Sequence, residues 1–187
     1  MTAVVGTCCL TATSHAAPER TLRALCGSEL WSLKTLSDPQ RKLVDLHPRT
    51  TTIPAINRRR APRVLTRRRD AFERQVWRVN AQIVEYKAEA DSDIHLVLYG
   101  QGSYLIAEMP AAACLPPTTR DRRAIVNARR VFVQRCGEAT DTWRQLGAVA
   151  WISGVGFWDF PHGQSGHARN YAELHPVTAI RLISGCG

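Results

Sequence analysis

Long apolar runs, Cys-x-x-Cys pairs and internal repeats are all missing from these 187 residues. A helix that spans a bilayer needs about 20 apolar residues, so no such span is predicted. Without a Cys-x-x-Cys pair, a zinc site built from thiolates is a weak interpretation of the cysteines. The hydrophobic fraction of 44% is enough for a core, and the length fits one ordinary domain plus extensions.

Acidic residues are scarce relative to basic ones, at 16 against 25, which gives a formal net charge of +9. A basic surface accelerates encounters with phosphate polymers, acidic glycans or anionic lipids. Much of the charge lies in an arginine-rich stretch between residues 58 and 78, where little periodicity is visible. Two interpretations of this stretch stay open: a solvated linker or an anion-binding arm.

The first 17 residues are small and apolar and end in Ser14-His15-Ala16-Ala17. This is typical of the tail of a secretory signal peptide, although no Lys or Arg precedes the apolar run. We therefore expect an exported protein, periplasmic or extracellular. Four cysteines remain after residue 17, which permit three pairings, and an oxidising compartment would favour two disulfides. They are Cys26, Cys114, Cys136 and Cys186.

The organised part of the chain begins near residue 75. Trp77, Val79, Ala81 and Ile83 alternate with polar residues, and this period of two predicts a half-buried strand over 75–87. Further strands are predicted over 94–99, 103–108, 148–158 and 172–183, and helical spacing of apolar residues predicts a helix over 121–136. We interpret residues 18–74 as an N-terminal extension and basic linker, and 75–187 as the domain.

The element order β-β-β-α-β-β is that of an OB-type barrel, a fold that commonly binds oligonucleotides or oligosaccharides. The predicted fold class is thus mainly β with one or two helices (α+β), as an OB-like five-stranded barrel with an N-terminal extension. Such an analogy of fold does not by itself give a function.

Acids and histidines alternate in two separate segments. Asp91, Asp93 and His95 are spaced by two, as are Glu173 and His175, so each set points to one side of an extended strand. If the segments meet, the side chains can hold a divalent cation (Ca, Mg or Mn) or transfer protons. The predicted metal ligands are Asp91, Asp93 and Glu173, and the predicted catalytic groups are His95, His162 and His175. Plainer roles stay open, as turn residues and as buried, hydrogen-bonded histidines.

Polar side chains suited to a substrate groove lie on the outward face of the first predicted strand and in the loop after residue 158. We assign substrate binding to Arg78, Asn80, Gln82, Gln164 and Asn170. Trp151, Phe157 and Trp158 are interpreted as core or rim residues, with a stacking platform for bases as the alternative.

Two family resemblances bear on the predicted domain and its function. Asp91-Ser-Asp93-Ile-His95, Ile106-Ala-Glu108-Met-Pro110 and the motif from Gly154 to Val177 resemble segments of a family of uncharacterised, often exported bacterial proteins. The match covers most of residues 26–182, and the segment His162-Gly-Gln-Ser-Gly166 through Glu173-Leu-His175-Pro-Val177 is its most specific part. This resemblance implies the domain and no reaction.

The layout from Asp91 to Pro110 is also similar to the front of staphylococcal-nuclease-like domains, which are OB-type barrels that cleave nucleic acid with calcium. The arginine that this family carries in its third strand is absent here, where Leu105 and Ile106 stand instead. Without it, the usual stabilisation of a pentavalent phosphate is missing.

Three functions follow from these observations. The first is an exported module that binds nucleic acid or another polyanion. The second is a metal-dependent nuclease or phosphodiesterase, and the third is a structural interaction domain of the cell envelope.

Overall fold

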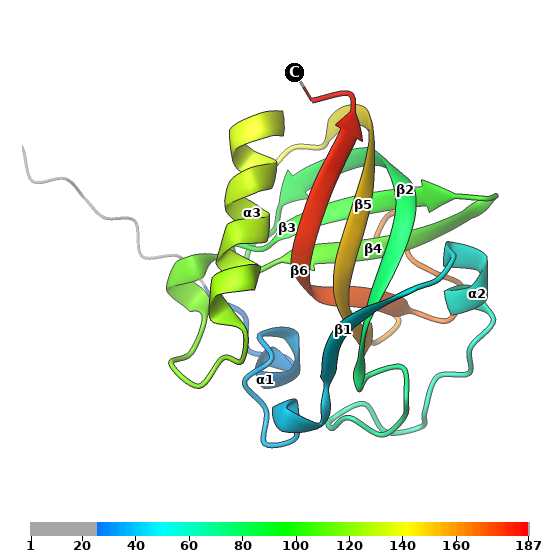
Figure 1. Cartoon of the computed structure of the whole chain (residues 1–187), viewed down its shortest axis with the longest axis vertical. Coiled ribbons are helices and arrows are strands. Elements are labelled where there is room, and N and C mark those ends of the chain that lie inside the picture. The colour runs from blue at the N-terminus through cyan, green and yellow to red at the C-terminus, as the bar shows by residue number, and fades with distance from the viewer. Residues whose placement is uncertain (1–25, 187) are drawn as a thin grey trace, which may run out of the picture.

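The computed structural model describes residues 26–186, and the signal-peptide prediction for residues 1–17 lies outside them. The chain begins with short elements: α1 (Trp31–Lys34), η1 (Arg41–Leu43), β1 (Asp45–Thr50) and α2 (Ile53–Asn57). The remaining elements are β2 (Gln75–Ala88), β3 (Ile94–Gly100), β4 (Ser103–Met109), η2 (Ala112–Cys114), α3 (Arg122–Cys136), β5 (Arg144–Trp158) and β6 (Ala172–Ser184). Figure 1 shows the strands crossing behind and beside the single long helix, α3.

The six strands form one sheet in the order β1-β2-β3-β4-β6-β5, and β2 also pairs with β5. All five predicted strands are present, which confirms a mainly β, α+β domain. The sheet does not close into a regular barrel: β1 adds a sixth strand beside β2, and register shifts interrupt several pairings. The parallel pairing of β4 with β6 is short, with Ile106 opposite Glu173 and Ala107 opposite Leu174.

The predicted helix is confirmed as α3, which buries one apolar face against the sheet. Ile125, Ala128 and Phe132 are buried at spacings of three and four, as an amphipathic helix requires. The Phe132 ring packs edge-on against Tyr86 of β2 at 5.0 Å between centroids. The Tyr86 hydroxyl donates to the Cys136 carbonyl in the last turn of the helix, at 2.9 Å. The arginine-rich face of α3 is therefore left toward solvent.

Part of the segment interpreted as an extension and linker belongs to the same sheet and core. β1 runs parallel to β2, and Ile53 and Ile56 of α2 are buried in the main hydrophobic core. Within the arginine-rich stretch, Arg68 is buried and pairs with Asp38. Arg68 thus anchors this stretch to the domain, while its neighbours Arg67 and Arg69 are exposed.

Two disulfides join the four cysteines in one of the three possible pairings. Cys26 pairs with Cys114, and Cys136 pairs with Cys186. The first ties the start of the described chain to η2, and the second ties the C-terminus to the end of α3. Of the helices within residues 26–186, none is long and apolar enough to cross a membrane.

Gly156 marks a close approach between β5 and the segment before β2. A Cβ at this position would lie 2.2 Å from the backbone oxygen of Phe72. Because a backbone atom cannot rotate away, Gly156→Ala is expected to lower the free energy of unfolding by about 1–3 kcal/mol, as other overpacked substitutions do. Gly100→Ala is the control, since its nearest contact would be an ordinary 3.4 Å. Urea unfolding that shows equal losses in both variants would contradict this account.

Candidate functional site

The sheet brings together three strand ends that carry acids and histidines. β4 lies between β3 and β6, so His95 of β3 is opposite Glu108 of β4, and Glu173 of β6 is opposite Ile106. Asp93 lies just before β3, and His175 follows two residues after Glu173, on the same side of β6. The side chains of Asp93, His95, Glu108, Glu173 and His175 are therefore all buried at one end of the sheet. We call this group the acid–imidazole cluster.

The cluster forms a continuous series of contacts between alternating carboxylates and imidazoles. His175 Nε2 lies 3.1 Å from Asp93 Oδ2, and His175 Nδ1 lies 3.3 Å from Glu108 Oε2. On the other side of Glu108, Oε1 lies 3.1 Å from His95 Nδ1, which is also 3.3 Å from Glu89 Oε1. Glu108 thus contacts both rings, and the series runs from fully buried Asp93 to Glu89 at the surface of the cluster.

The opposite charges of these groups shift their pKa values. Burial by itself would lower the pKa of His175, but the carboxylates of Asp93, Glu173 and Glu108 outweigh it and raise the pKa to about 10. The same balance with Glu108 and Glu89 raises the pKa of His95 to about 9. Burial opposes the ionisation of Glu108, yet the two histidines hold its pKa at about 2.

Glu173 differs from the other carboxylates of the cluster. Burial is the main cause that raises its pKa to about 7, and the negative charges of Glu108 and Asp159 add to it. Its Oε2 lies 3.8 Å from His175 Nδ1, the longest ion-pair contact in the cluster. Glu173 therefore stands at the edge of the series.

A pocket of about 440 Å³ opens onto one end of the cluster. It is lined by His95 and Glu108 together with Lys34, Lys87, Glu89, Asp91, Trp143 and residues 162–165. Lys34 is largely buried and lies 3.6 Å from Asp159, and its pKa is raised because the surrounding carboxylates outweigh the cost of burial. The pocket therefore joins two lysines, a histidine-rich loop and the solvent-facing end of the acid–imidazole cluster.

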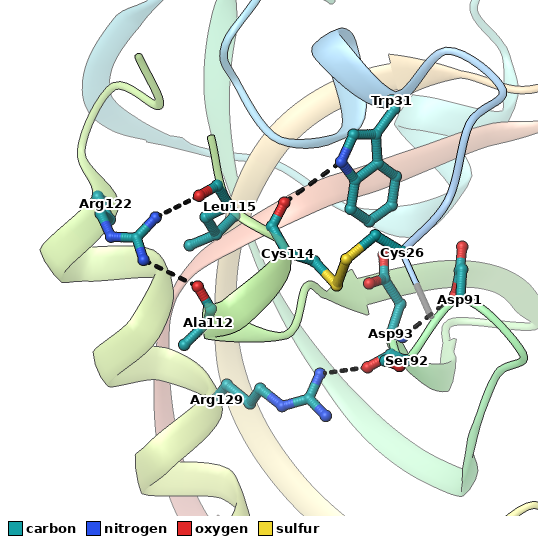
Figure 2. The surroundings of a disulfide bond; sticks show 10 residues. All are labelled: Cys26, Trp31, Asp91, Ser92, Asp93, Ala112, Cys114, Leu115, Arg122 and Arg129. Carbon is teal, nitrogen blue, oxygen red and sulfur yellow. Dashed lines mark hydrogen bonds between the residues drawn. A yellow bond between two sulfur atoms is a disulfide. The ribbon is translucent and has the colours of Figure 1, made fainter. Parts of the chain in front are cut away.

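The turn before β3 is held by a hydrogen bond from α3 and lies beside the first disulfide (Figure 2). Asp91 Oδ1 accepts from the backbone N–H of Asp93 at 3.1 Å, and Arg129 of α3 donates to the Ser92 carbonyl at 2.8 Å. Figure 2 shows the Cys26–Cys114 bridge beside this turn. Asp91 thus shapes the turn as well as lining the pocket, and it does not reach His175.

The structure gathers most of the residues predicted for catalysis and metal binding. Asp93, His95, Glu173 and His175 lie in the acid–imidazole cluster, and Asp91 and His162 line the adjoining pocket. Four further residues of the site were not predicted from the sequence: Glu89, Glu108, Lys34 and Lys87. The position of Glu108 could have been predicted from the β3–β4 hairpin. Its tight turn at Gly100–Gly102 sets a register that places Glu108 opposite His95.

The residues predicted to bind substrate are distributed over two places. Arg78, Asn80 and Gln82 are exposed on the outer face of β2, far along the sheet from Lys87, which pairs with His95. Gln164 lines the pocket described above. Asn170 instead joins two segments of backbone, since its amide donates to the Ile56 and Arg59 carbonyls at 2.9 and 3.0 Å.

The outer face of β2, β5 and β6 is hollowed beside a tryptophan. Trp151 of β5 is opposite Asn80 of β2 and Arg181 of β6. It lines two adjoining depressions of about 190 and 410 Å³, one toward Thr50–Ile53 and one toward Arg78 and Arg181. The Arg78 guanidinium carbon lies 5.2 Å from the centre of the Trp151 ring, and Nη2 donates to Thr50 Oγ1 at 2.8 Å. We call these two depressions the Trp151 groove.

No family model matches this sequence, and neither does any curated protein. Among solved structures, the fold is similar to part of a protein described as an aspartyl-tRNA synthetase from Leishmania major Friedlin, with a TM-score of 0.44, 10% identity and 74% of this chain covered. It is also similar to part of the asparaginyl-tRNA synthetase of Entamoeba histolytica in complex with asparaginyl-adenylate, with a TM-score of 0.37, 10% identity and 60% covered. The match spans 21% of each of those chains.

Proposed function

We propose that this domain binds single-stranded nucleic acid in the Trp151 groove. The observation that carries the proposal is the Arg78 guanidinium lying over the Trp151 ring inside a groove. Proteins that bind single strands combine aromatic rings, on which bases stack, with cations that follow the phosphates. Both components are present here within one face of three strands.

The surroundings of the groove favour an anionic ligand. Arg78 and Arg181 line the larger depression, and the chain carries a net charge of +9. Asn80 and Gln82, which continue the row along β2, offer amide groups that hydrogen-bond to base edges or phosphates. Three threonines at the end of β1, Thr50–Thr52, close the smaller depression with hydroxyl donors. A single strand thus finds a stacking surface, cations and neutral donors in one place.

The strand pairings support an OB-type arrangement for β2–β6. β2 pairs with β3 and β5, β3 with β4, β4 with β6 in parallel, and β6 with β5. We infer that these five strands correspond to an OB-type barrel with β1 added beside it. Folds of this type bind oligonucleotides on the surface of the barrel.

Two disulfides also favour an oxidising compartment, because such bonds are rare in reducing ones. Export to the periplasm or the cell exterior is therefore part of the proposal. The ligand in that setting is single-stranded nucleic acid outside the cytoplasm.

The test is fluorescence anisotropy with a labelled oligothymidylate at several salt concentrations. We expect Trp151→Ala to weaken binding roughly tenfold or more, since base stacking contributes about 1–3 kcal/mol per base. Arg78→Ala is expected to weaken binding and to reduce the salt slope by about 1. Arg123→Ala on the exposed side of α3 removes the same charge away from the groove and is the control. Equal losses of affinity in Arg78→Ala and Arg123→Ala, or no binding at low salt, would refute the proposal that nucleic acid binds in the Trp151 groove.

A metal-dependent phosphodiesterase is the second candidate. It is favoured by one observation: Lys34 and Lys87 line the same pocket as His95, Glu108 and Glu89. Lysines can bind a phosphate while carboxylates and imidazole hold a cation. This candidate predicts that the labelled oligothymidylate is cut in the presence of Mn²⁺, Mg²⁺ or Ca²⁺ and stays intact with EDTA.

A further inference from the structure

Three donor atoms converge at the mouth of the acid–imidazole cluster. His95 Nδ1 lies 3.3 Å from Glu89 Oε1 and 3.1 Å from Glu108 Oε1. The donor atoms of these three residues all lie within 4.8 Å of one another. They come from three places in the chain, the turn after β2, strand β3 and strand β4, so their convergence is a product of the tertiary fold.

The hydrogen bonding of His95 determines which ring nitrogen is free. Nε2 lies 3.2 Å from the backbone oxygen of Ser165, and a carbonyl oxygen only accepts, so Nε2 carries the hydrogen. Once Nδ1 has lost its own hydrogen, it directs a lone pair toward the two carboxylates, as a metal ligand must. Metal-bound histidines typically donate their second ring N–H to a backbone carbonyl or a carboxylate in this way.

The buried polar atoms at this point are not satisfied by one another. Neither His95 Nδ1 nor Glu108 Oε1 forms a hydrogen bond of acceptable geometry, although both are buried and only 3.1 Å apart. Buried polar atoms normally have a hydrogen-bond partner. A cation between the three donors satisfies all of them together, since its bonds need no shared hydrogen.

A second layer of residues holds Glu108 in place. Its other oxygen, Oε2, lies 3.3 Å from His175 Nδ1, while His175 Nε2 lies 3.1 Å from Asp93. Outer partners of this kind orient the ligands of metal sites. They also give a role to Asp93 and His175, which are fully buried and do not line the pocket.

Asp93, Glu108 and His175 are a poorer set of ligands. Their donor atoms also lie within 4.8 Å of one another. However, Asp93 and Glu108 face opposite nitrogens of the His175 ring, at Nε2 and Nδ1. A single ion cannot bond to both carboxylates and to one ring nitrogen in that arrangement. In contrast, Glu89 and Glu108 face the same nitrogen of His95.

We propose that Glu89, His95 and Glu108 form a divalent transition-metal site that opens into the pocket lined by Lys34, Lys87 and His162. One imidazole and two carboxylates suit Mn²⁺, Fe²⁺, Co²⁺ or Zn²⁺ better than Ca²⁺, which takes oxygen ligands only. Three protein ligands leave coordination positions free on the pocket side, as in catalytic metal sites. Lys87 Nζ, which lies 3.3 Å from Glu89 Oε1, competes for that carboxylate and moves when the ion binds. The site uses different residues from the Trp151 groove, so the metal-binding test and the nucleic-acid-binding test can fail independently.

The test is titration of Mn²⁺ into the untagged full chain, after treatment with EDTA and dialysis. Calorimetry is expected to show one Mn²⁺ per chain, and pulsed electron paramagnetic resonance should show coupling to one imidazole nitrogen. Glu89→Gln is expected to weaken Mn²⁺ binding by at least about 10–100-fold, the loss typical of outer-layer partners of a metal. Glu89 is partly exposed, so this variant should fold.

Matched variants separate the proposed site from its neighbours. Glu85→Gln, four residues earlier on β2, should keep the wild-type affinity, because Glu85 contacts Gln145 and Ser165 and none of the three proposed ligands. His95→Gln should remove the nitrogen coupling while circular dichroism reports an intact sheet. The proposal is overturned if calorimetry shows no stoichiometric binding of Mn²⁺, or if Glu89→Gln binds Mn²⁺ as tightly as the wild-type protein does. It is equally overturned if the nitrogen coupling survives in His95→Gln.

Discussion

Replacing Arg68 with methionine is expected to lower the free energy of unfolding by about 3–5 kcal/mol, the loss typical when one partner of a buried ion pair is removed. Arg68 Nη2 lies 2.9 Å from Asp38 Oδ2, and Nε donates to the same oxygen at 3.0 Å. The guanidinium also donates to the Glu73 and Leu33 carbonyls at 3.1 and 3.0 Å. Methionine fills much of the space but leaves Asp38 buried without a counter-charge. Urea denaturation followed by circular dichroism measures the loss.

Arg67→Met is the control for this experiment, because Arg67 is exposed and adjacent in sequence. Its effect should stay within about 0.5 kcal/mol, as for most surface substitutions. The double variant Asp38→Asn with Arg68→Met should be less destabilised than the sum of the single variants, since the unpaired charge is gone. Equal unfolding midpoints for Arg67→Met and Arg68→Met would show that the buried pair contributes nothing.

Removing the Cys26–Cys114 disulfide is expected to cost about 2–5 kcal/mol, toward the upper end because the bond closes a long loop. The two cysteines are 88 residues apart in sequence. The double variant Cys26→Ser/Cys114→Ser should therefore unfold at lower urea concentration than the wild-type protein. It should also lose the coupling between the N-terminal segment and the Asp91–Asp93 turn, beside which the bond lies (Figure 2).

The control for this second experiment is the other disulfide, Cys136–Cys186, which spans 50 residues. Its removal should cost slightly less, because the entropy of loop closure depends only weakly on loop length. Hydrogen exchange distinguishes the two: loss of Cys26–Cys114 should increase exchange at residues 91–93, and loss of Cys136–Cys186 should increase it at the end of α3. A wild-type protein whose stability is unchanged by a reductant would contradict both expectations.

The strands and the long helix were predictable because their buried faces repeat in the sequence. In β2, Val79, Ala81 and Ile83 are buried between exposed polar neighbours, and this alternation is visible without any structure. β1 was not predicted, because the segment Asp45–Thr50 has no alternation and contains Pro48. Its parallel pairing with β2 depends on contacts that a local pattern does not record.

The site was only partly predictable, for a similar reason. The spacing of Asp93 and His95, and of Glu173 and His175, places each pair on one face of a strand. Glu108 stands alone in sequence, and only its position opposite His95 shows that it connects the two sets. Arg68 could not be singled out for a different reason: it stands in a run of arginines, and nothing in the sequence shows that it is the buried one.

The placement of one carboxylate between two imidazoles has a consequence for any attempt to re-engineer this protein. Glu108 cannot turn toward His95 without turning away from His175, because its two oxygens are rigidly joined. Asp93 does not line the pocket. A substitution there is nevertheless expected to change the pocket, because it would tilt the Glu108 carboxylate through His175. Substitutions on the two sides of Glu108 should be non-additive, so variants of this protein are best compared in pairs.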